Sequence, residues 1–397
     1  MVPSVRKQFN GSFDQAAYRA FISDLDSFHP GAIDFRVAET PVFIPRGFGD
    51  MIKGTCEHII DRILEPGFRE LTERAIPQSD RVPNENGHPH MISFDFGICI
   101  GENGLPEPKL IEMQAFPTLY GFQVLHPEAI ERHFHIPDGY SHFFNGYDRN
   151  SYISALRDVI IGDCNPENVI LLEIRPHEQK TRIDFYCTKE YLGIEIVCLT
   201  QLKSEGTKLF YEKDGRRIRV DRIYNRVIFD ELHAQRDTLG EIPDITRPWD
   251  VEWIPHPNWF YRISKFTLPY IRHPHVPETF FLDALKELPD DLENFVLKPL
   301  FSFAGQGVVI DVTKADIDAV KEPAHWILQR KVRYADIIET PDIPAKAEIR
   351  MMYIWKDGAA RPILATNLAR LSKGKMIGVR YNKDKEWVGA SVAYFEK

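Results

Sequence analysis

The sequence predicts an α+β protein with a β-α-β lobe at its centre, and three observations lead to this fold class. First, two strand-like runs at 90–100 and 108–116 are joined by GENGLPE, a segment rich in turn residues. Second, the apolar run at 167–174, the helical pattern at 177–192 and the apolar run at 194–199 form a β-α-β unit. Third, the C-terminal third alternates short helices with further strands.

The remaining elements follow from local patterns. The expected elements are, in order, helices at 12–29 and 50–75, a hairpin at 208–220, helices at 263–271 and 314–321, and then four further strands. Asp214-Gly215 marks the turn of the hairpin. We divide the chain into helices with the two acidic strands (1–150), the β-α-β lobe (151–250) and a C-terminal lobe (251–397).

Composition narrows the class of protein. The chain has 397 residues, of which 43% are hydrophobic and 27% charged, as in ordinary globular proteins. Its net charge is −9 and its basic residues form no run, so we expect no nucleic-acid partner. Five scattered cysteines without a CxxC pair indicate reduced thiols and a cytoplasmic location. No run of about 18 apolar residues is present, so we expect no membrane span.

The segment FVLKPLFSFAGQGVVI carries the first candidate site. Lys298 ends an apolar strand, and Gly305 and Gly307 follow in a loop of small residues. Glycines let backbone amides approach a phosphate closely, and a lysine supplies a point charge to it. A lysine at a strand end that simply extends into water is the alternative. Neither a Walker loop nor a Rossmann fingerprint is present.

The two acidic strands carry the second candidate site. Asp95 lies in SFDFG, and Glu112 and Gln114 lie two apart in LIEMQAF. Residues at i and i+2 share a face of a strand, so pairing of the two strands would bring all three together. Such oxygen ligands suit Mg²⁺. A solvated sheet edge is the alternative, and DFG here lacks the other protein-kinase motifs.

Arginines and histidines give further candidates. Arg350 in AEIRMMYIW and Arg370 in ATNLARLSK stand inside strand-like runs, and their guanidinium groups suit carboxylate or phosphate. Structural ion pairs are the alternative for both. The histidine groups could ligate zinc, although they form no HExxH or zinc-finger spacing. These groups are HPH at 88–90, His126, HFH at 133–135, His142 and HPH at 273–275.

In this order, the motifs resemble the ATP-grasp superfamily in its circularly permuted form, as in the synthetase domain of glutathionylspermidine synthetase. SFDF…LIEMQAFPT is similar to the relatives' metal-binding strands, and VLKPLFSFAGQG to their lysine and glycine loop. LQRKV is similar to their adenine hinge, and YRISKF to a segment with a second phosphate lysine. The chain departs from the relatives at Ser93, Gln114 and Arg330, where they carry arginine, asparagine and an acid.

The resemblance implies a set of roles. ATP would be held by Lys265, Lys298, Gly305, Gln306, Gly307, Gln329 and Lys331, and Mg²⁺ by Asp95, Glu112 and Gln114. Arg350 and Arg370 would steady developing negative charge. Arg226, or Arg222 in the same segment, would bind a substrate carboxylate.

The resemblance also implies a function, with alternatives. It implies an ATP-dependent ligase that joins a small-molecule or peptide acid to an amine through an acyl phosphate. A phosphotransferase on the same fold, a zinc-dependent hydrolase and a nucleotide-binding module without catalysis are the alternatives.

Overall fold

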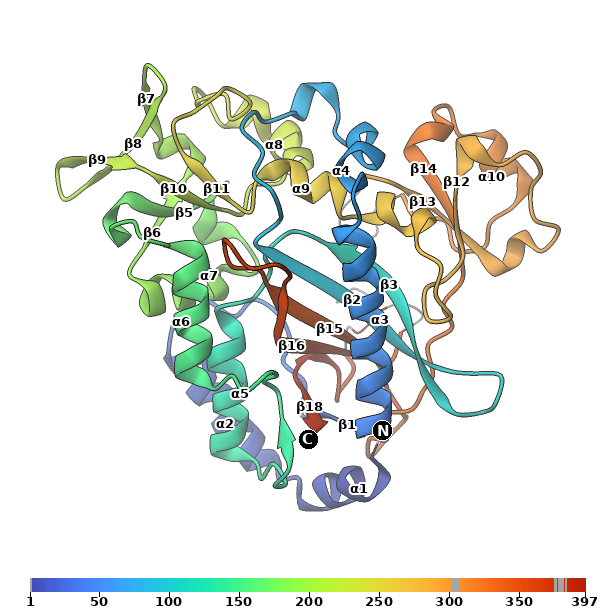
Figure 1. Cartoon of the computed structure of the whole chain (residues 1–397). Helices are drawn as coiled ribbons and strands as arrows, with labels where there is room; N and C mark the ends of the chain where they lie inside the picture. Colours follow the sequence, from blue (N-terminus) through green and yellow to red (C-terminus); the bar gives the residue numbers. More distant parts are fainter. Residues whose placement is uncertain (1, 302–306, 375–376, 378–381, 383) are drawn as a thin grey trace.

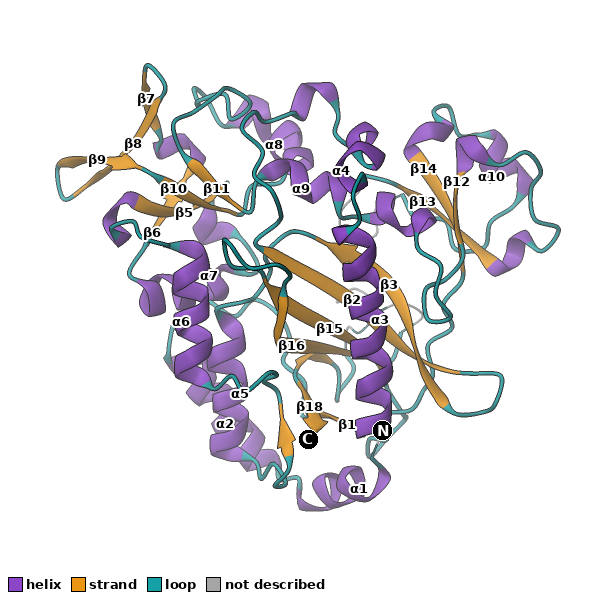
Figure 2. Ribbon diagram, viewed as in Figure 1, coloured by secondary structure: helices purple, strands orange, loops and turns teal. Residues whose placement is uncertain are grey.

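The computed structural model describes residues 2–301, 307–374, 377, 382 and 384–397. Gly305 and Gln306 of the predicted phosphate loop therefore lie outside the described residues. The elements form a central antiparallel sheet, a parallel lobe beside it and a small third lobe (Figure 2). All five cysteines are unpaired thiols, as expected.

A five-stranded antiparallel sheet forms the centre of the molecule (Figure 1). Its strands in spatial order are β17 (Gly389–Ser391), β16 (Ile363–Ser372), β15 (Lys346–Ile354), β2 (Met91–Ile100) and β3 (Pro106–Gln114). The strands expected at 90–100 and 108–116 are confirmed, and they form a hairpin. Because β2 pairs with β15, early and late parts of the chain share one sheet.

Helix α3 (Arg46–Leu64) runs across this sheet (Figure 1). Its buried residues recur every three or four positions and form one stripe, namely Phe48, Ile52, Cys56, Ile59, Ile60 and Ile63. The stripe packs in the same core as Phe94 and Phe96 of β2. Side chains alternate along a strand, so Asp95 points to the opposite face of the sheet.

The helix expected over 50–75 is wrong in extent. Helix α3 ends before Pro66, since a residue that precedes proline disfavours helical backbone. Gly67 follows with φ of 90°, a conformation that suits glycine. The short helix α4 (Phe68–Leu71) begins after it.

The middle of the chain forms a parallel four-stranded sheet. Its strands in spatial order are β11 (Glu252–Ile254), β10 (Arg222–Asn225), β5 (Val169–Glu173) and β6 (Glu195–Cys198). Helix α7 (Arg182–Leu192) connects β5 to β6, so the predicted β-α-β unit is confirmed. The other helices seen on this side of Figure 1 are α2 (Gln15–Ser27), α5 (Phe122–His133), α6 (Arg149–Ile160) and α8 (Phe229–Gln235).

A three-stranded antiparallel sheet projects from this lobe (Figure 1). It consists of β7 (Lys203–Glu205), β8 (Lys208–Lys213) and β9 (Arg216–Val220). The predicted hairpin turn is confirmed, because Asp214 and Gly215 both have positive φ, at 50° and 71°. Such a pair of angles matches the right-handed twist of the flanking strands.

The third lobe is small and has its own core. Its antiparallel strands are β12 (Thr279–Phe281), β14 (Trp326–Arg330) and β13 (Phe295–Pro299), next to helix α10 (Lys314–Asp318). The helix expected over 263–271 is a 3₁₀ helix at Lys265–Tyr270 that follows α9 (Pro257–Arg262). Pro269 explains the difference, because it has no N–H for an α-helical hydrogen bond.

Strands near the two ends of the chain pair in a small three-stranded sheet. Helix α1 (Pro3–Ser12) precedes β1 (Val42–Ile44), which pairs in parallel with β18 (Ala393–Glu396), and β18 also pairs with β4 (Tyr140–Ser141). After α10 the described residues contain five strands, β14 to β18, where four were expected.

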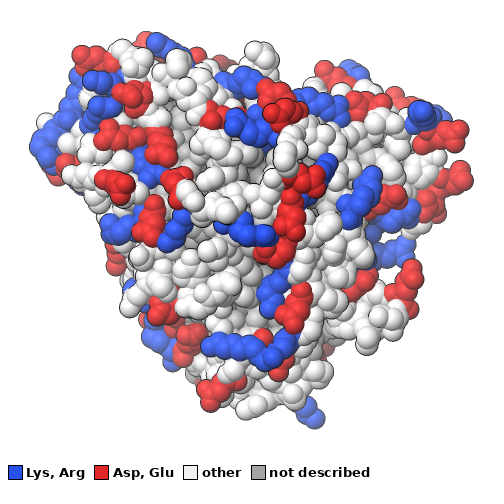
Figure 3. Space-filling view, viewed as in Figure 1, with Lys and Arg blue, Asp and Glu red and all other residues white. Residues whose placement is uncertain are grey.

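Charges of both signs are interspersed over the face shown in Figure 3, without a broad basic area there. Among the described residues, no helix has both the length and the apolar character needed to cross a bilayer.

Candidate active site

Adjacent strands of the central sheet place charged residues in one row. Asp95 of β2 lies opposite Arg350 of β15 and opposite Glu112 of β3. Glu348, two residues before Arg350, lies opposite Arg370 of β16. Paired positions and positions two apart share a face of a sheet, so all five side chains lie on the face opposite α3.

Asp95 is the centre of this row. It is 1% exposed, and its Oδ1 accepts from Arg350 Nε at 2.5 Å while its Oδ2 accepts from Arg350 Nη2 at 2.6 Å. Arg370 Nη2 donates to the same Oδ2 at 2.7 Å and also binds Glu348, which accepts from Tyr334 at 2.6 Å. Burial raises the pKa of Asp95, but the charges of the two arginines outweigh this and hold the pKa below its usual range.

The prediction that Asp95, Glu112 and Gln114 hold Mg²⁺ stays a prediction, and in this structure arginines engage two of the three side chains. Both oxygens of Asp95 are engaged by arginines. The Gln114 amide, turned so that its oxygen faces Arg350, accepts from Nη1 at 2.7 Å and Nη2 at 3.2 Å. Glu112, with 41% of its side chain exposed, lies 3.8 Å from the same guanidinium. Only Glu112 therefore keeps a carboxylate that an approaching cation could reach.

Lys298 of β13 belongs to the same site. Its ammonium donates to Gln329 Oε1 at 2.6 Å. Burial, together with the charge of Lys265, lowers the pKa of Lys298 to about 8, against the opposing effect of Glu112 and Glu348. Charges shift a pKa mainly at short range, so the predicted meeting of the lysine segment with the acidic strands is supported by this coupling.

Two further parts of the predicted nucleotide site lie beside Lys298. Lys265 begins the 3₁₀ helix and donates to Pro299 O at 3.0 Å, and burial lowers its pKa. Gly307 has φ of 72°, and a Cβ there would lie 3.1 Å from Pro299 Cγ, so this end of the loop requires glycine. Gly305 and Gln306 fall outside the described residues.

The adenine hinge expected near Gln329 and Lys331 stays a prediction, and the structure shows what these two residues contact. Gln329 lies in β14, the middle strand of its sheet, so its backbone is paired on both sides. Its side chain is engaged by Lys298 and Thr279. Lys331 pairs with Asp311 at 2.9 Å, and its own N–H donates to a backbone carbonyl.

Arg226 is buried in a second part of the site. It is 4% exposed, and its guanidinium lies 4.9 Å from the ring centroid of Phe116 and 5.2 Å from that of Phe185. Within the described structure its Nε and Nη1 have no hydrogen-bond partner. Burial raises the pKa of Glu173 to about 8 and also raises that of Asp184, and the charge of Arg226 opposes both shifts. Buried unpaired donors are costly and suggest an anionic ligand.

The position of Arg226 in the parallel sheet agrees with a ligand site. From β5 the chain continues to β6, its neighbour on one side in the sheet, whereas β10 and β11 lie on the other side of β5. Glu173 ends β5 and Arg226 follows β10, so both lie at the carboxyl ends of strands at a switch in strand order. Ligands of parallel α/β sheets bind at such points. Phe116, which contacts Arg226, is two residues beyond Gln114 of the central sheet.

Comparison with known proteins gives one informative result. No family model and no curated protein sequence matches the chain. Among solved structures, a glutathione synthetase-like effector from Globodera pallida, in its apo form, superposes with a TM-score of 0.58 at 10% identity. The match covers 96% of this chain and 97% of that one. The fold of the chain therefore resembles that of this glutathione synthetase-like effector.

This comparison concerns the fold alone. The circular permutation, the likeness to glutathionylspermidine synthetase and the three domain boundaries stay predictions.

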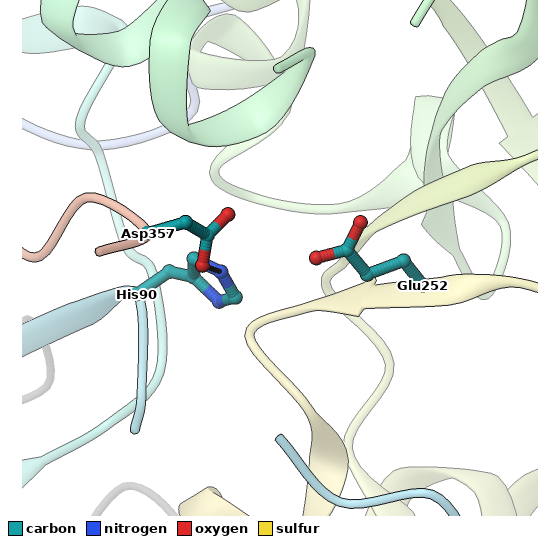
Figure 4. Close-up of side chains that lie close together, drawn as sticks. All are labelled: His90, Glu252 and Asp357. Atoms are coloured by element: carbon teal, nitrogen blue, oxygen red, sulfur yellow. Dashed lines mark hydrogen bonds and ion pairs between the residues drawn. The ribbon is translucent and has the colours of Figure 1, made fainter. Parts of the chain in front are cut away.

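The zinc alternative depends on the histidines. In the described part of the chain, one group could offer three ligands to an ion, namely His90, Glu252 and Asp357, whose ligand atoms lie within 4.8 Å of one another (Figure 4). Arg222 is already paired with both carboxylates, at 3.1 Å from Glu252 and 3.4 Å from Asp357. Arg222 thus belongs to this group, and of the two arginines considered for substrate binding only Arg226 lies at the strand ends.

The hydrogen bonds of His90 also oppose zinc. Trp259 donates to Asn86 Oδ1 at 2.8 Å, which leaves the Asn86 NH₂ group facing His90 Nδ1 at 3.3 Å. His90 Nδ1 is therefore the acceptor, and the proton is assigned to Nε2, which donates to Asp357 at 3.0 Å. A ligating histidine needs the reverse arrangement. The segment at 88–90 thus forms an ion-pair cluster, with no second group of this kind in the described residues.

Sequence reasoning missed several members of the site. Glu348 could have been found, because it stands two residues before Arg350 and shares its strand face. Tyr334 and Asp184 gave no signal, since their roles depend on contacts between distant segments. Glu173 ends a predicted strand, but its burial beside Arg226 could not be read from the sequence.

Proposed function

We propose that the chain is an ATP-dependent ligase that joins a carboxylate to an amine. The observation that carries this proposal is the convergence of four cationic side chains, Lys265, Lys298, Arg350 and Arg370, on one row of the central sheet. The carboxylates that face them among the described residues are Asp95, Glu112, Glu348 and Asp230. Cationic side chains gathered in one place suit an anionic ligand such as a triphosphate. The glutathione synthetase-like fold supports the same reaction class.

The chain's own residues suit the two halves of the reaction. Lys298 and Lys265 bind the phosphates of ATP. Arg226, which lies beside the rings of Phe116 and Phe185, binds the carboxylate of the acid substrate. The substrate oxygen attacks the γ-phosphorus, the bond to the bridging oxygen breaks, and ADP leaves. The amine nitrogen then attacks the acyl carbon, phosphate leaves, and the nitrogen loses a proton.

Arg370 is suited to steady the charge that develops on the transferred phosphoryl group. Its Nη2 is engaged by Asp95 and Glu348, but its Nε has no partner within the described structure. One such donor is typically worth about 3–4 kcal/mol of the barrier. No step is assigned to Mg²⁺ at Asp95 or Gln114, because their oxygens are already bound by arginine.

Trapping with hydroxylamine tests this proposal. The full chain is incubated with ATP, Mg²⁺, hydroxylamine and a panel of carboxylic acids, and ADP and hydroxamate are measured together. A ligase should form hydroxamate with its own acid, because hydroxylamine captures an acyl phosphate. A phosphotransferase would release ADP without hydroxamate.

Two variants serve as controls. Lys298→Ala should abolish ADP release, whereas Lys321→Ala, which changes an exposed lysine of the same lobe, should leave it unchanged. Equal ADP release from Lys298→Ala and the wild-type chain would contradict the proposed nucleotide site.

A further inference from the structure

The guanidinium of Arg350 lies at the place where the sequence predicted a divalent cation. It contacts both oxygens of Asp95 at 2.5 and 2.6 Å and the Gln114 amide oxygen at 2.7 Å, and it lies 3.8 Å from Glu112. These are the same three side chains that would have formed the cage. A planar cation with five N–H donors thus replaces a spherical one.

We infer that Arg350 is a built-in cation that takes the place of a protein-bound metal in this row. The chain therefore has no divalent-cation site among Asp95, Glu112 and Gln114. This inference deepens the proposed function. Its consequence for nucleotide binding rests on the proposed function, whereas the statement about metal binding does not. Metal ions would then reach this site only together with a ligand's own phosphates.

The contacts of Arg350 explain why a cation would not displace it. Arg350 is 5% exposed and Asp95 is 1% exposed, so their two parallel hydrogen bonds are shielded from water. Charge-assisted, bidentate pairs of this kind are the strongest that arginine makes. Turning Asp95 toward a metal would leave a buried guanidinium without its carboxylate, which is strongly unfavourable.

The positive side chains around Asp95 also oppose the binding of a divalent cation. Arg370 also binds Asp95, and its pKa is raised because Glu348 and Asp95 outweigh its burial. Lys298 approaches the row from β13 of the third lobe, and Lys265 approaches it from the start of the 3₁₀ helix after α9. A divalent cation would therefore meet four positive side chains, of which two already share the carboxylate it needs.

The register of the sheet explains why an arginine, and no other cationic side chain, can take the place of the metal ion. Arg350 is the direct cross-strand partner of Asp95, and Ser93, one position along the same face, is small and 1% exposed. A lysine at 350 could not contact both oxygens and the amide at once, because it lacks the fork geometry.

A Mn²⁺ titration followed by electron paramagnetic resonance tests the inference without any nucleotide. The wild-type full chain should bind no Mn²⁺ at Asp95, Glu112 or Gln114. Glu112→Gln should therefore leave the Mn²⁺ titration curve unchanged. Arg350→Gln should gain one Mn²⁺ site, because it frees Asp95 and Gln114. The double variant Arg350→Gln, Asp95→Asn should lose that site again.

Two controls separate charge from shape. Arg350→Lys keeps a positive charge in place and should gain no site, and Arg333→Gln, which changes an exposed arginine, should behave as wild type. Wild-type Mn²⁺ binding that is lost on Glu112→Gln would overturn the inference, and so would the absence of a gain in folded Arg350→Gln. The wild-type arm decides even if Arg350→Gln does not fold.

The same preparations distinguish this inference from the proposed function. ATP binding is measured by calorimetry in EDTA and in excess Mg²⁺. Absence of ATP binding in both would remove the proposed function and leave the Mn²⁺ result standing. Binding in EDTA within about tenfold of that in Mg²⁺ would agree with both, since arginine and lysine then supply the charge.

Discussion

At the scale of single residues, burial sets the charge of the groups that matter most. Lys298 and Glu173 lie in different lobes. Burial lowers the pKa of Lys298 to about 8 and raises the pKa of Glu173 to about 8. Groups with pKa values near neutrality cluster at functional sites, because proton exchange and ligand charge can then be matched.

The low pKa of Lys298 predicts how ATP binding depends on pH. Phosphate binding needs the protonated lysine, so affinity should be constant below pH 8 and fall by up to about tenfold per pH unit above it. Arginine stays charged, so Lys298→Arg should bind ATP with little change between pH 7 and pH 9. Calorimetric titrations at several pH values measure this. The same decline in Lys298→Arg would show that another group titrates.

The raised pKa of Glu173 predicts a pH dependence of stability. Between its ordinary value of 4.5 and about 8, the folded chain holds a proton that the unfolded chain has lost. The free energy of unfolding should therefore fall as pH rises through this window, by up to about 1.4 kcal/mol per pH unit. Glu173→Gln should remove this slope.

Urea unfolding at pH 5 to 8 compares Glu173→Gln with the wild-type chain. Glu178→Gln, in an exposed position five residues further along the chain, is the matched control and should keep the wild-type slope. Parallel curves for Glu173→Gln and wild type would mean that Glu173 is ionised in the fold.

At the scale of elements, the antiparallel register of β2, β15 and β16 creates the charged row. Asp95 is held by one arginine from the adjacent strand and by another from the strand beyond it. The row thus joins strands that are far apart in the sequence. Its stability is that of a buried ion-pair network, in which the loss of one member leaves the others unpaired.

Removal of Asp95 should therefore destabilise the fold. Asp95→Ala leaves the buried Arg350 without its carboxylate and should lower the free energy of unfolding by about 3–5 kcal/mol. Glu112→Ala changes a half-exposed carboxylate of the same row and should cost less than about 1 kcal/mol. Urea titrations at pH 7 measure both. Similar midpoints for the two variants would show that the row contributes little to stability.

Most elements could be predicted from the sequence because their signals are local. The acidic hairpin, the β-α-β unit and the Asp214-Gly215 turn depend on alternation and turn residues within short windows. Helix limits failed where a proline was overlooked, as at Pro66 and Pro269. The predicted meeting of acids and lysines was supported, but the pairing of Asp95 with Arg350 was not foreseen, because register between distant strands has no local signal.

At the scale of the whole molecule, the C-terminal strand closes the fold on the N-terminal region. Strand β18 lies beside β1, with Tyr394 opposite Phe43 and Phe395 opposite Ile44. Val2 N–H in turn donates to Phe43 O at 3.3 Å. The two segments therefore pack together, and we expect the N-terminal helices to depend on β18.

Truncation of the C-terminus tests this dependence. Removal of residues 393–397 deletes Tyr394 and Phe395, which are 1% and 6% exposed, and burial of each such side chain is worth about 1.5–3 kcal/mol. The truncated chain should lose at least about 3 kcal/mol in urea unfolding, and limited proteolysis should cut first within residues 2–44. Removal of Lys397 alone, an exposed residue, should change neither result by much. Resistance of residues 2–44 to protease in the truncated chain would show that the N-terminal region folds without β18, and that the two ends are joined by contact rather than by mutual dependence.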